Sequence, residues 1–263
     1  MKKGFQQFTV RDLLTSKAET LSVFKKLRSL GYDSIHGYTL PIFTLAEYKE
    51  MTREAGLENI TSGGDFEAMR DGTAAIKQAV ADAKFLGTSL VGVGTLPKAY
   101  RESEEGYRRY AAEINRIAEA LKSEGLKIIY HPHAIECFSL GGGLKGLDIM
   151  INETDHEAVL FCLDTHWLAC AGVSVIEYIR LVRGRMPVIH VKDYAIVKAA
   201  VDKVEEVHKQ FAEVGEGNLN WPSIIAACRE TGVEYAVVEQ DYCAAGPLES
   251  LTTSITNLIA FGV

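Results

Sequence analysis

The stretch Val159-Leu160-Phe161-Cys162-Leu163 is an unbroken apolar run that ends at a carboxylate, Asp164. A short run of this kind, bounded by helical patterns, indicates a strand buried on both faces, as in a parallel sheet covered by helices. Three similar runs, at residues 126–130, 187–189 and 235–238, precede Glu136, His190 and Glu239. Each run therefore places a side chain that can bind a metal ion or carry a proton at or beyond the end of a buried strand.

The spacing of these four residues predicts a barrel. They are separated by 28, 26 and 49 positions, which fits one, one and one enlarged βα repeat. Strand-like stretches occur throughout the chain, at residues 5–9, 34–36, 57–61, 89–93, 126–130, 159–163, 187–191 and 235–239. Amphipathic stretches lie between them, at residues 20–30, 66–86, 104–124 and 174–183 among others.

Eight strand-like units favour a closed barrel over an open doubly wound sheet. No Pro- or Ser-rich linker divides the chain. The sequence therefore predicts an α/β fold, a (β/α)8 TIM barrel in which residues 1–263 form a single domain. In such a barrel, the four polar side chains meet at the C-terminal rim, where TIM-barrel enzymes carry their active sites.

The composition argues for a small-molecule partner. The net charge is −7 and Lys and Arg form no run, whereas nucleic acids and anionic membrane surfaces attract concentrated positive charge. The first residues lack the apolar core of a signal peptide, and nowhere do about 18 apolar residues stand together. The five cysteines form no CxxC pair, which favours reduced thiols. We therefore expect a soluble, cytoplasmic protein that binds neither nucleic acid nor membrane.

Six segments carry a family resemblance. They are residues 6–11 (QQFTVR), 130–136 (YHPHAIE), 163–167 (LDTHW), 190–193 (HVKD), 214–221 (VGEGNLNW) and 238–241 (VEQD). In this order they resemble the sugar phosphate isomerase/epimerase family of xylose-isomerase-like barrels, which includes inosose dehydratases and ketose 3-epimerases. The resemblance implies an enzyme with one divalent cation, often Mn²⁺ or Mg²⁺, that acts on a sugar or polyol. Since family members commonly self-associate, it also leaves a homo-oligomer open.

The expected metal ligands are three carboxylates and one imidazole. They are Glu136, Asp164, His190 and Glu239. This donor set suits a hard divalent cation that works beside sugar hydroxyls. Glu136 lies several residues beyond its strand, whereas His131 and His133 lie nearer to the strand end. Either histidine is therefore an alternative first ligand.

Other polar side chains near the expected rim are candidates for catalysis or substrate binding. Lys192 follows His190 by two positions, so on an extended strand it points the same way and can stabilise negative charge on a substrate oxygen. The alternative is a lysine that extends from the rim into solvent. His133 is a candidate for moving a proton. The expected substrate contacts are His36, His131, His166 and Trp167.

The expected chemistry begins with loss of a proton beside a carbonyl group. Glu136 or Glu239 removes this proton, and a residue on the opposite face returns it to an enediolate. Return to the same carbon describes an epimerase, return to the adjacent carbon an isomerase, and loss of a β-hydroxyl a dehydratase. A sugar-binding barrel without catalysis is a further hypothesis. A nuclease is disfavoured, because the chain is acidic and Trp167 stands where an additional histidine would be needed.

Overall fold

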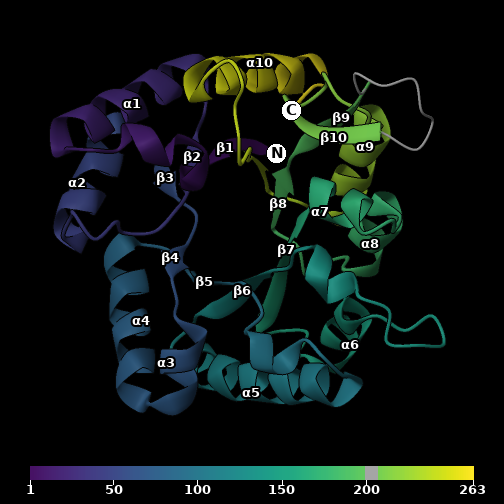
Figure 1. Cartoon of the computed structure of the whole chain (residues 1–263). Helices are drawn as coiled ribbons and strands as arrows, with labels where there is room; N and C mark the ends of the chain where they lie inside the picture. Colours follow the sequence, from purple (N-terminus) through teal and green to yellow (C-terminus); the bar gives the residue numbers. More distant parts are fainter. Residues whose placement is uncertain (199–206) are drawn as a thin grey trace.

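The computed structural model describes residues 1–198 and 207–263 and confirms the predicted barrel. Nine parallel strands form one sheet in the order β3-β2-β1-β11-β8-β7-β6-β5-β4, which curls into a nearly closed barrel (Figure 1). The strands are β1 (Lys2–Gln6), β2 (Ser34–His36), β3 (Glu58–Asn59), β4 (Ser62–Gly63), β5 (Leu90–Gly94), β6 (Lys127–His131), β7 (Val159–Asp164), β8 (Val188–Val191) and β11 (Tyr235–Val238). The strands β11, β8, β7 and β6, which lead to the predicted metal ligands, are consecutive neighbours in this sheet.

The third and first strands differ in detail from the prediction. The strand expected at residues 57–61 consists of two short pieces, of which β3 pairs with β2 and β4 pairs with β5. The first strand begins and ends three residues earlier than expected. The Gln6 side chain accepts a hydrogen bond from the Phe8 N–H and so starts a 3-10 helix, η1 (Gln7–Leu13), where the strand was expected to continue.

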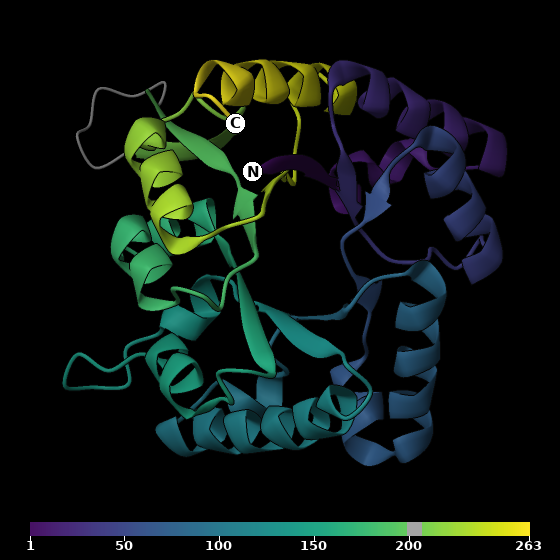
Figure 2. The ribbon, with the colours of Figure 1, turned by 180° about the vertical axis from the view of Figure 1, so that it is seen from behind.

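Helices surround the strands on the outside (Figures 1 and 2). They are α1 (Lys17–Leu30), α2 (Leu45–Ala55), α3 (Phe66–Asp71), α4 (Thr73–Leu86), α5 (Glu104–Lys122), α6 (Gly146–Glu153), α7 (Thr165–Cys170), α8 (Val175–Leu181), α9 (Trp221–Thr231) and α10 (Pro247–Ala260), with short 3-10 turns η2 (Lys98–Tyr100) and η3 (Ala134–Cys137). The helix expected at residues 66–86 is divided by Gly72, whose backbone is extended. Among the described residues, no helix is both long and apolar enough to cross a membrane.

The inside of the barrel is filled by a separate apolar cluster. Its members are Ile60, Leu90, Ile129, Leu160, Cys162, Val188 and Val237. Side chains alternate along a strand, so Asp164 faces the same interior as Cys162, one step nearer to the C-terminal rim. The apolar layer closes the barrel beneath the polar rim and leaves the rim as the place for chemistry.

An antiparallel hairpin accounts for the long gap between His190 and Glu239. It consists of β9 (Asp193–Lys198) and β10 (Val207–Ala212) and directly follows β8 on the rim side. Asp193 is buried and accepts hydrogen bonds from the backbone N–H groups of Gly215 and Gly217, at 3.1 and 3.2 Å. It also accepts from Leu219 N and Trp221 Nε1, at 3.3 and 2.5 Å. Asp193 therefore ties the loop before α9 to the end of β8.

We expect Asp193→Ala to lower the free energy of unfolding by about 3 kcal/mol or more, since it leaves several buried N–H groups without an acceptor. Urea denaturation measures the effect. Asp71→Ala is the matched control, because Asp71 forms an exposed ion pair with Arg70 and should contribute less than about 1 kcal/mol. Equal stability of the two variants would contradict the bracing role of Asp193.

Candidate metal centre at the carboxyl rim

Four side chains from adjacent strands converge at the C-terminal rim. His131 ends β6, Asp164 ends β7, His190 lies in β8, and Glu239 directly follows β11. One nitrogen or oxygen atom from each lies within 4.8 Å of the others, as in a metal site. The register explains the convergence, because Asp164 is paired directly with His190, and His190 with Val237. The structure thus brings together three of the four predicted ligands, with His131 as the fourth.

Three atoms of this cluster are buried without a hydrogen-bond partner among the described residues. They are Asp164 Oδ2, His190 Nδ1 and Glu239 Oε2. The last two lie 2.5 Å apart, but without the alignment that a hydrogen bond requires. The other Asp164 oxygen accepts a hydrogen bond from the Trp167 N–H at 2.9 Å. Buried polar atoms normally have a hydrogen-bond partner. Three buried oxygen and nitrogen atoms without one, in a cluster whose ligand atoms lie within 4.8 Å of one another, therefore fit a bound cation.

The ring of His131 is oriented for the same point. Its Nδ1 lies 2.9 Å from the backbone carbonyl oxygen of Cys162. A carbonyl oxygen can only accept, so Nδ1 carries the proton and Nε2 keeps its lone pair. Metal-binding histidines usually hold their second nitrogen in this way. Burial, together with the nearby His190, lowers the pKa of His131 well below its ordinary value, so the ring is neutral and able to bind a cation.

Glu136 lies outside this cluster, in contrast to the prediction from sequence. Strand β6 ends at His131, and the following turn η3 folds the chain so that Glu136 is completely buried. Its carboxylate accepts hydrogen bonds from the Tyr130 hydroxyl and, at 2.9 Å, from the His133 N–H. Burial raises the pKa of Glu136. Both oxygens are thus engaged in fixing the loop after β6.

Lys192 supplies positive charge to the carboxylates. It is fully buried rather than extended into solvent, and its Nζ lies 3.4 Å from Glu239 Oε1 and 3.8 Å from Asp164 Oδ2. Burial alone would lower the pKa of Lys192, but the neighbouring carboxylates outweigh burial and raise it. Burial raises the pKa of Asp164 to about 7 although Lys192 opposes the change. The positive charge of Lys192 therefore offsets part of the negative charge of the carboxylates.

Asp241 also belongs to this charge network, although the sequence did not predict a role for it. Its Oδ2 lies 2.7 Å from Lys192 Nζ, which is shorter than either distance from Lys192 to the metal-ligand candidates. The only sequence signal is its position two residues after Glu239, which on an extended segment places both side chains on one side. Asp241 thus helps to fix the direction in which the lysine points.

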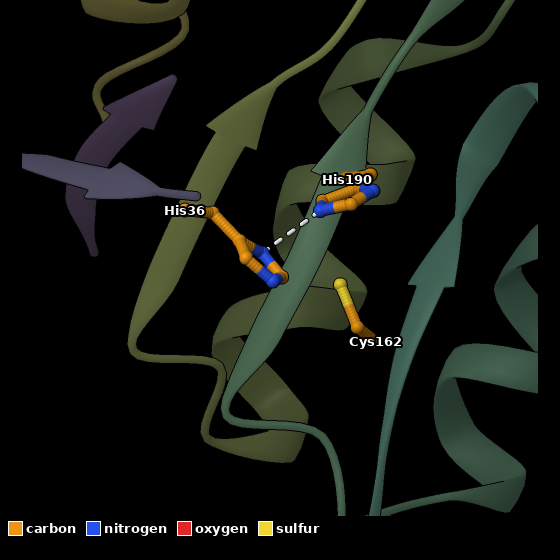
Figure 3. A group of neighbouring side chains, drawn as sticks. All are labelled: His36, Cys162 and His190. Atoms are coloured by element: carbon orange, nitrogen blue, oxygen red, sulfur yellow. Dashed lines mark hydrogen bonds between the residues drawn. The ribbon is translucent and has the colours of Figure 1, made fainter. Parts of the chain in front are cut away.

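The remaining predicted residues divide between two sides of the rim. His36, at the end of β2, contacts His190 across the barrel mouth, with 3.0 Å between His36 Nδ1 and His190 Nε2 (Figure 3). His133 packs edge-on against Trp167, and the Trp167 ring lies 4.8 Å from Lys192 Nζ. His166 lies under the hairpin, against Phe211 of β10. Burial and then Lys192 lower the pKa of His166 to about 4.

A pocket of about 440 Å³ opens beside the cluster, and both His131 and His190 reach it. Its other walls come from the ends of β1, β2, β4 and β5, with polar groups on Tyr38, Thr61 and Asp65. None of the described residues that line it is lysine or arginine. Of the expected substrate contacts, His36 and His131 line this pocket, whereas His166 and Trp167 do not. His133 and Lys192 also lie outside its lining. The pocket thus offers hydrogen-bonding groups without positive charge.

Comparisons with known proteins agree with this architecture. The family model described as xylose isomerase-like TIM barrel matches residues 24–253. An inosose dehydratase of Clostridium botulinum (strain Alaska E43 / Type E3) is 26% identical over 203 residues, which cover 70% of this chain and 65% of that protein. An inosose dehydratase of Clostridium perfringens (strain ATCC 13124) is 26% identical over 165 residues, which cover 57% of this chain and 53% of that protein. The matches span between half and two thirds of these relatives.

Solved structures share the fold at lower identity. A sugar phosphate isomerase/epimerase from Parabacteroides distasonis has a TM-score of 0.80 and 22% identity, with 98% of this chain and 94% of that chain covered. The IolI protein, solved with a bound zinc atom, has a TM-score of 0.74 and 15% identity, with 99% of this chain and 98% of that chain covered. At these identities the likeness shows the fold alone.

Substitutions of His131 and Glu136 test which of the two residues is the fourth metal ligand. We expect His131→Gln to lower metal affinity by about 10-fold or more, since it removes a ligand nitrogen, whereas Glu136→Gln should leave the metal content unchanged. Elemental analysis of the purified proteins and titration with Mn²⁺ or Zn²⁺ measure both. Loss of metal from the Glu136 variant together with full metal content in the His131 variant would reverse the assignment.

Proposed function

The chain belongs to the xylose isomerase-like TIM barrel family, and we propose that it is a divalent-metal-dependent isomerase or epimerase of an uncharged keto-sugar or related polyol. The observation that carries the proposal is the set of buried ligand atoms on Asp164, His190 and Glu239 that have no hydrogen-bond partner among the described residues, beside a pocket that fits a small polar molecule. Such atoms are costly to bury unless a ligand satisfies them. Among the relatives described above, the inosose dehydratases are named for an unphosphorylated keto-polyol substrate, which supports this substrate class.

The donor set bears on which ion is bound. With His131 in place of Glu136, the site offers two imidazole nitrogens and two carboxylates. Imidazole ligands suit Zn²⁺ and other transition metals, whereas Mg²⁺ prefers oxygen donors and water. We therefore favour Mn²⁺ or Zn²⁺ over Mg²⁺.

The residues of the chain have separate parts in the proposed reaction. When bound, the cation acts as a Lewis acid that polarises a substrate carbonyl and makes the neighbouring C–H more acidic. Burial opposes the charge on Glu239, but His190 and Lys192 hold its pKa well below the ordinary value, so Glu239 is a weak base. Burial lowers the pKa of His133, which keeps its ring neutral and able to accept a proton. We assign the proton transfer to His133 and the stabilisation of negative charge to Lys192.

The pocket indicates the class of substrate. Phosphate groups are usually held by arginine, by lysine or by the N-terminus of a helix. The described lining residues carry no cationic side chain other than histidines, and burial lowers the pKa of His36 to about 3, which keeps that ring neutral. Hydroxyl, amide and carboxylate groups such as those of Gln6, Thr61 and Asp65 instead match the hydroxyl groups of a sugar or cyclitol. An unphosphorylated keto-polyol fits these walls best.

A dehydratase is the second candidate. The inosose dehydratases that match the chain favour it, since removal of the proton beside the carbonyl can be followed by loss of a β-hydroxyl. The two candidates share their first step, and their products differ by one water molecule. Product analysis after that step therefore separates them.

Proton exchange in D2O tests the function directly. With Mn²⁺ or Zn²⁺ added, we expect the protein to introduce deuterium next to the carbonyl of an unphosphorylated ketose or inosose, and His133→Asn to slow the exchange by about 10²-fold with metal content retained. NMR and mass spectrometry record the exchange and any loss of water. Phosphorylated ketoses serve as the comparison and should exchange more slowly. Absence of exchange and of elimination for every substrate offered would contradict the proposal.

Lys192→Met should lower kcat by about 10²-fold when measured at saturating Mn²⁺ or Zn²⁺, because it removes a preorganised charge from the site. The matched control is Lys209→Met, since Lys209 is an exposed lysine on β10 that lies over the Tyr194 ring. Steady-state kinetics on the substrate found by exchange measures the effect. A Lys192 variant with near-normal kcat would remove the lysine from the mechanism.

A further inference from the structure

His36 and His190 meet across the barrel mouth, although 154 positions separate them in the sequence. His36 Nδ1 and His190 Nε2 lie 3.0 Å apart, and both rings are buried. Figure 3 shows the two rings facing each other from different strands, with the Cys162 thiol beside them. A contact of this length between two ring nitrogens requires that one of them donates a proton and the other accepts it.

The direction of this hydrogen bond follows from the other nitrogen of His190. His190 Nδ1 faces Glu239 Oε2 at 2.5 Å and is part of the four-residue cluster. To bind a cation, Nδ1 must offer a lone pair, so the proton of the neutral ring then resides on Nε2. Nε2–H therefore donates, and His36 Nδ1 accepts.

The other three candidate ligands are each oriented by a neighbouring group. The Trp167 N–H donates a hydrogen bond to Asp164, and the Cys162 carbonyl oxygen accepts one from His131. Lys192 Nζ lies 3.4 Å from Glu239 Oε1. For Asp164 and His131 the orienting group belongs to the backbone. For His190, the corresponding partner is the side chain of His36, so this contact can be removed by substitution.

We propose that His36 is a positioning residue of the metal centre, which accepts a hydrogen bond from His190 Nε2 and thereby fixes the tautomer and the angle of the His190 ring. The proposal rests on the proposed metal-dependent function. Partners of this kind typically contribute 10–100-fold to metal affinity. It assigns His36 a role toward the ligand set in addition to its place in the pocket wall.

The same three side chains allow a different use. His36, Cys162 and His190 also lie close enough together to hold a thiophilic cation by themselves. That arrangement needs the lone pair of His190 on Nε2, pointing away from Asp164 and Glu239, so it is incompatible with the positioning role. Burial raises the pKa of the Cys162 thiol, so a cation there would have to displace its proton. The hydrogen bond is the arrangement that satisfies both nitrogens of His190.

Metal affinity of three His36 variants tests the proposal. We expect His36→Phe and His36→Gln to bind Mn²⁺ or Zn²⁺ about 10–100-fold more weakly than the natural chain by titration calorimetry. His36→Asn should stay close to the natural affinity, because the Asn amide oxygen lies near the position of Nδ1 whereas the Gln oxygen lies farther out. Tyr38→Phe is the control, since Tyr38 lines the same pocket and is expected to leave the affinity unchanged.

Two results would overturn the positioning role. One is a metal affinity in His36→Gln equal to that of the unsubstituted chain, or an equal loss of metal affinity in the Asn and Gln variants. The comparison of these two variants remains informative if the Phe variant does not fold. The other is a thiolate-to-Co²⁺ charge-transfer band in the Co²⁺-loaded protein that disappears in Cys162→Ser, which would place the cation on the thiol. If the unsubstituted chain bound no cation at all, the proposed metal-dependent function itself would fail. The two results above would overturn only the positioning role of His36.

Discussion

The rest of the site depends on two carboxylates and one imidazole that are buried, beside a second, partly buried imidazole, at the ends of adjacent parallel strands. Asp164 and Glu239 lie within a few ångströms of each other, and like charges so placed repel strongly in a low-dielectric interior. Lys192 offsets part of this repulsion, but three ligand atoms keep no hydrogen-bond partner among the described residues. A divalent cation at their centre removes both difficulties at once, which is the physical basis of the proposed function.

The fold makes this cluster possible because the strands β11, β8, β7 and β6 are neighbours. Apolar side chains fill the barrel beneath the rim, and on the rim side His131 and His190 of the cluster reach the pocket. Orientation then comes from a ring of contacts, in which backbone groups hold Asp164 and His131, and side chains hold Glu239 and His190. Precise placement of ligands by their neighbours is what allows a metal centre to act on a substrate.

Much of this was predictable from the sequence, because it depends on local pattern. Asp164, His190 and Glu239 each end an apolar run, and strand alternation with βα spacing was enough to bring them together. The sequence left Glu136, His131 and His133 open as the fourth candidate ligand, since the choice depends on the path of the turn η3 after β6. The hairpin β9–β10 was hidden within an enlarged repeat. The contact of Asp241 with Lys192 depends on the path of the chain after β11, and the contact of His36 with His190 joins strands that are not neighbours in the sheet. Contacts made across a closed barrel leave no periodic signal in the chain.

Anomalous X-ray scattering from crystals grown with Mn²⁺ or Zn²⁺ is the most direct test of the proposed metal centre, because it locates the ion without reference to activity. A cation at the proposed centre would give a single strong peak at about 2.0–2.2 Å from His131 Nε2, Asp164 Oδ2, His190 Nδ1 and Glu239 Oε2, the range usual for nitrogen and carboxylate ligands of zinc. An ion coordinated by Glu136 or by the Cys162 thiol, or crystals without an ion at the rim, would contradict the proposed metal centre.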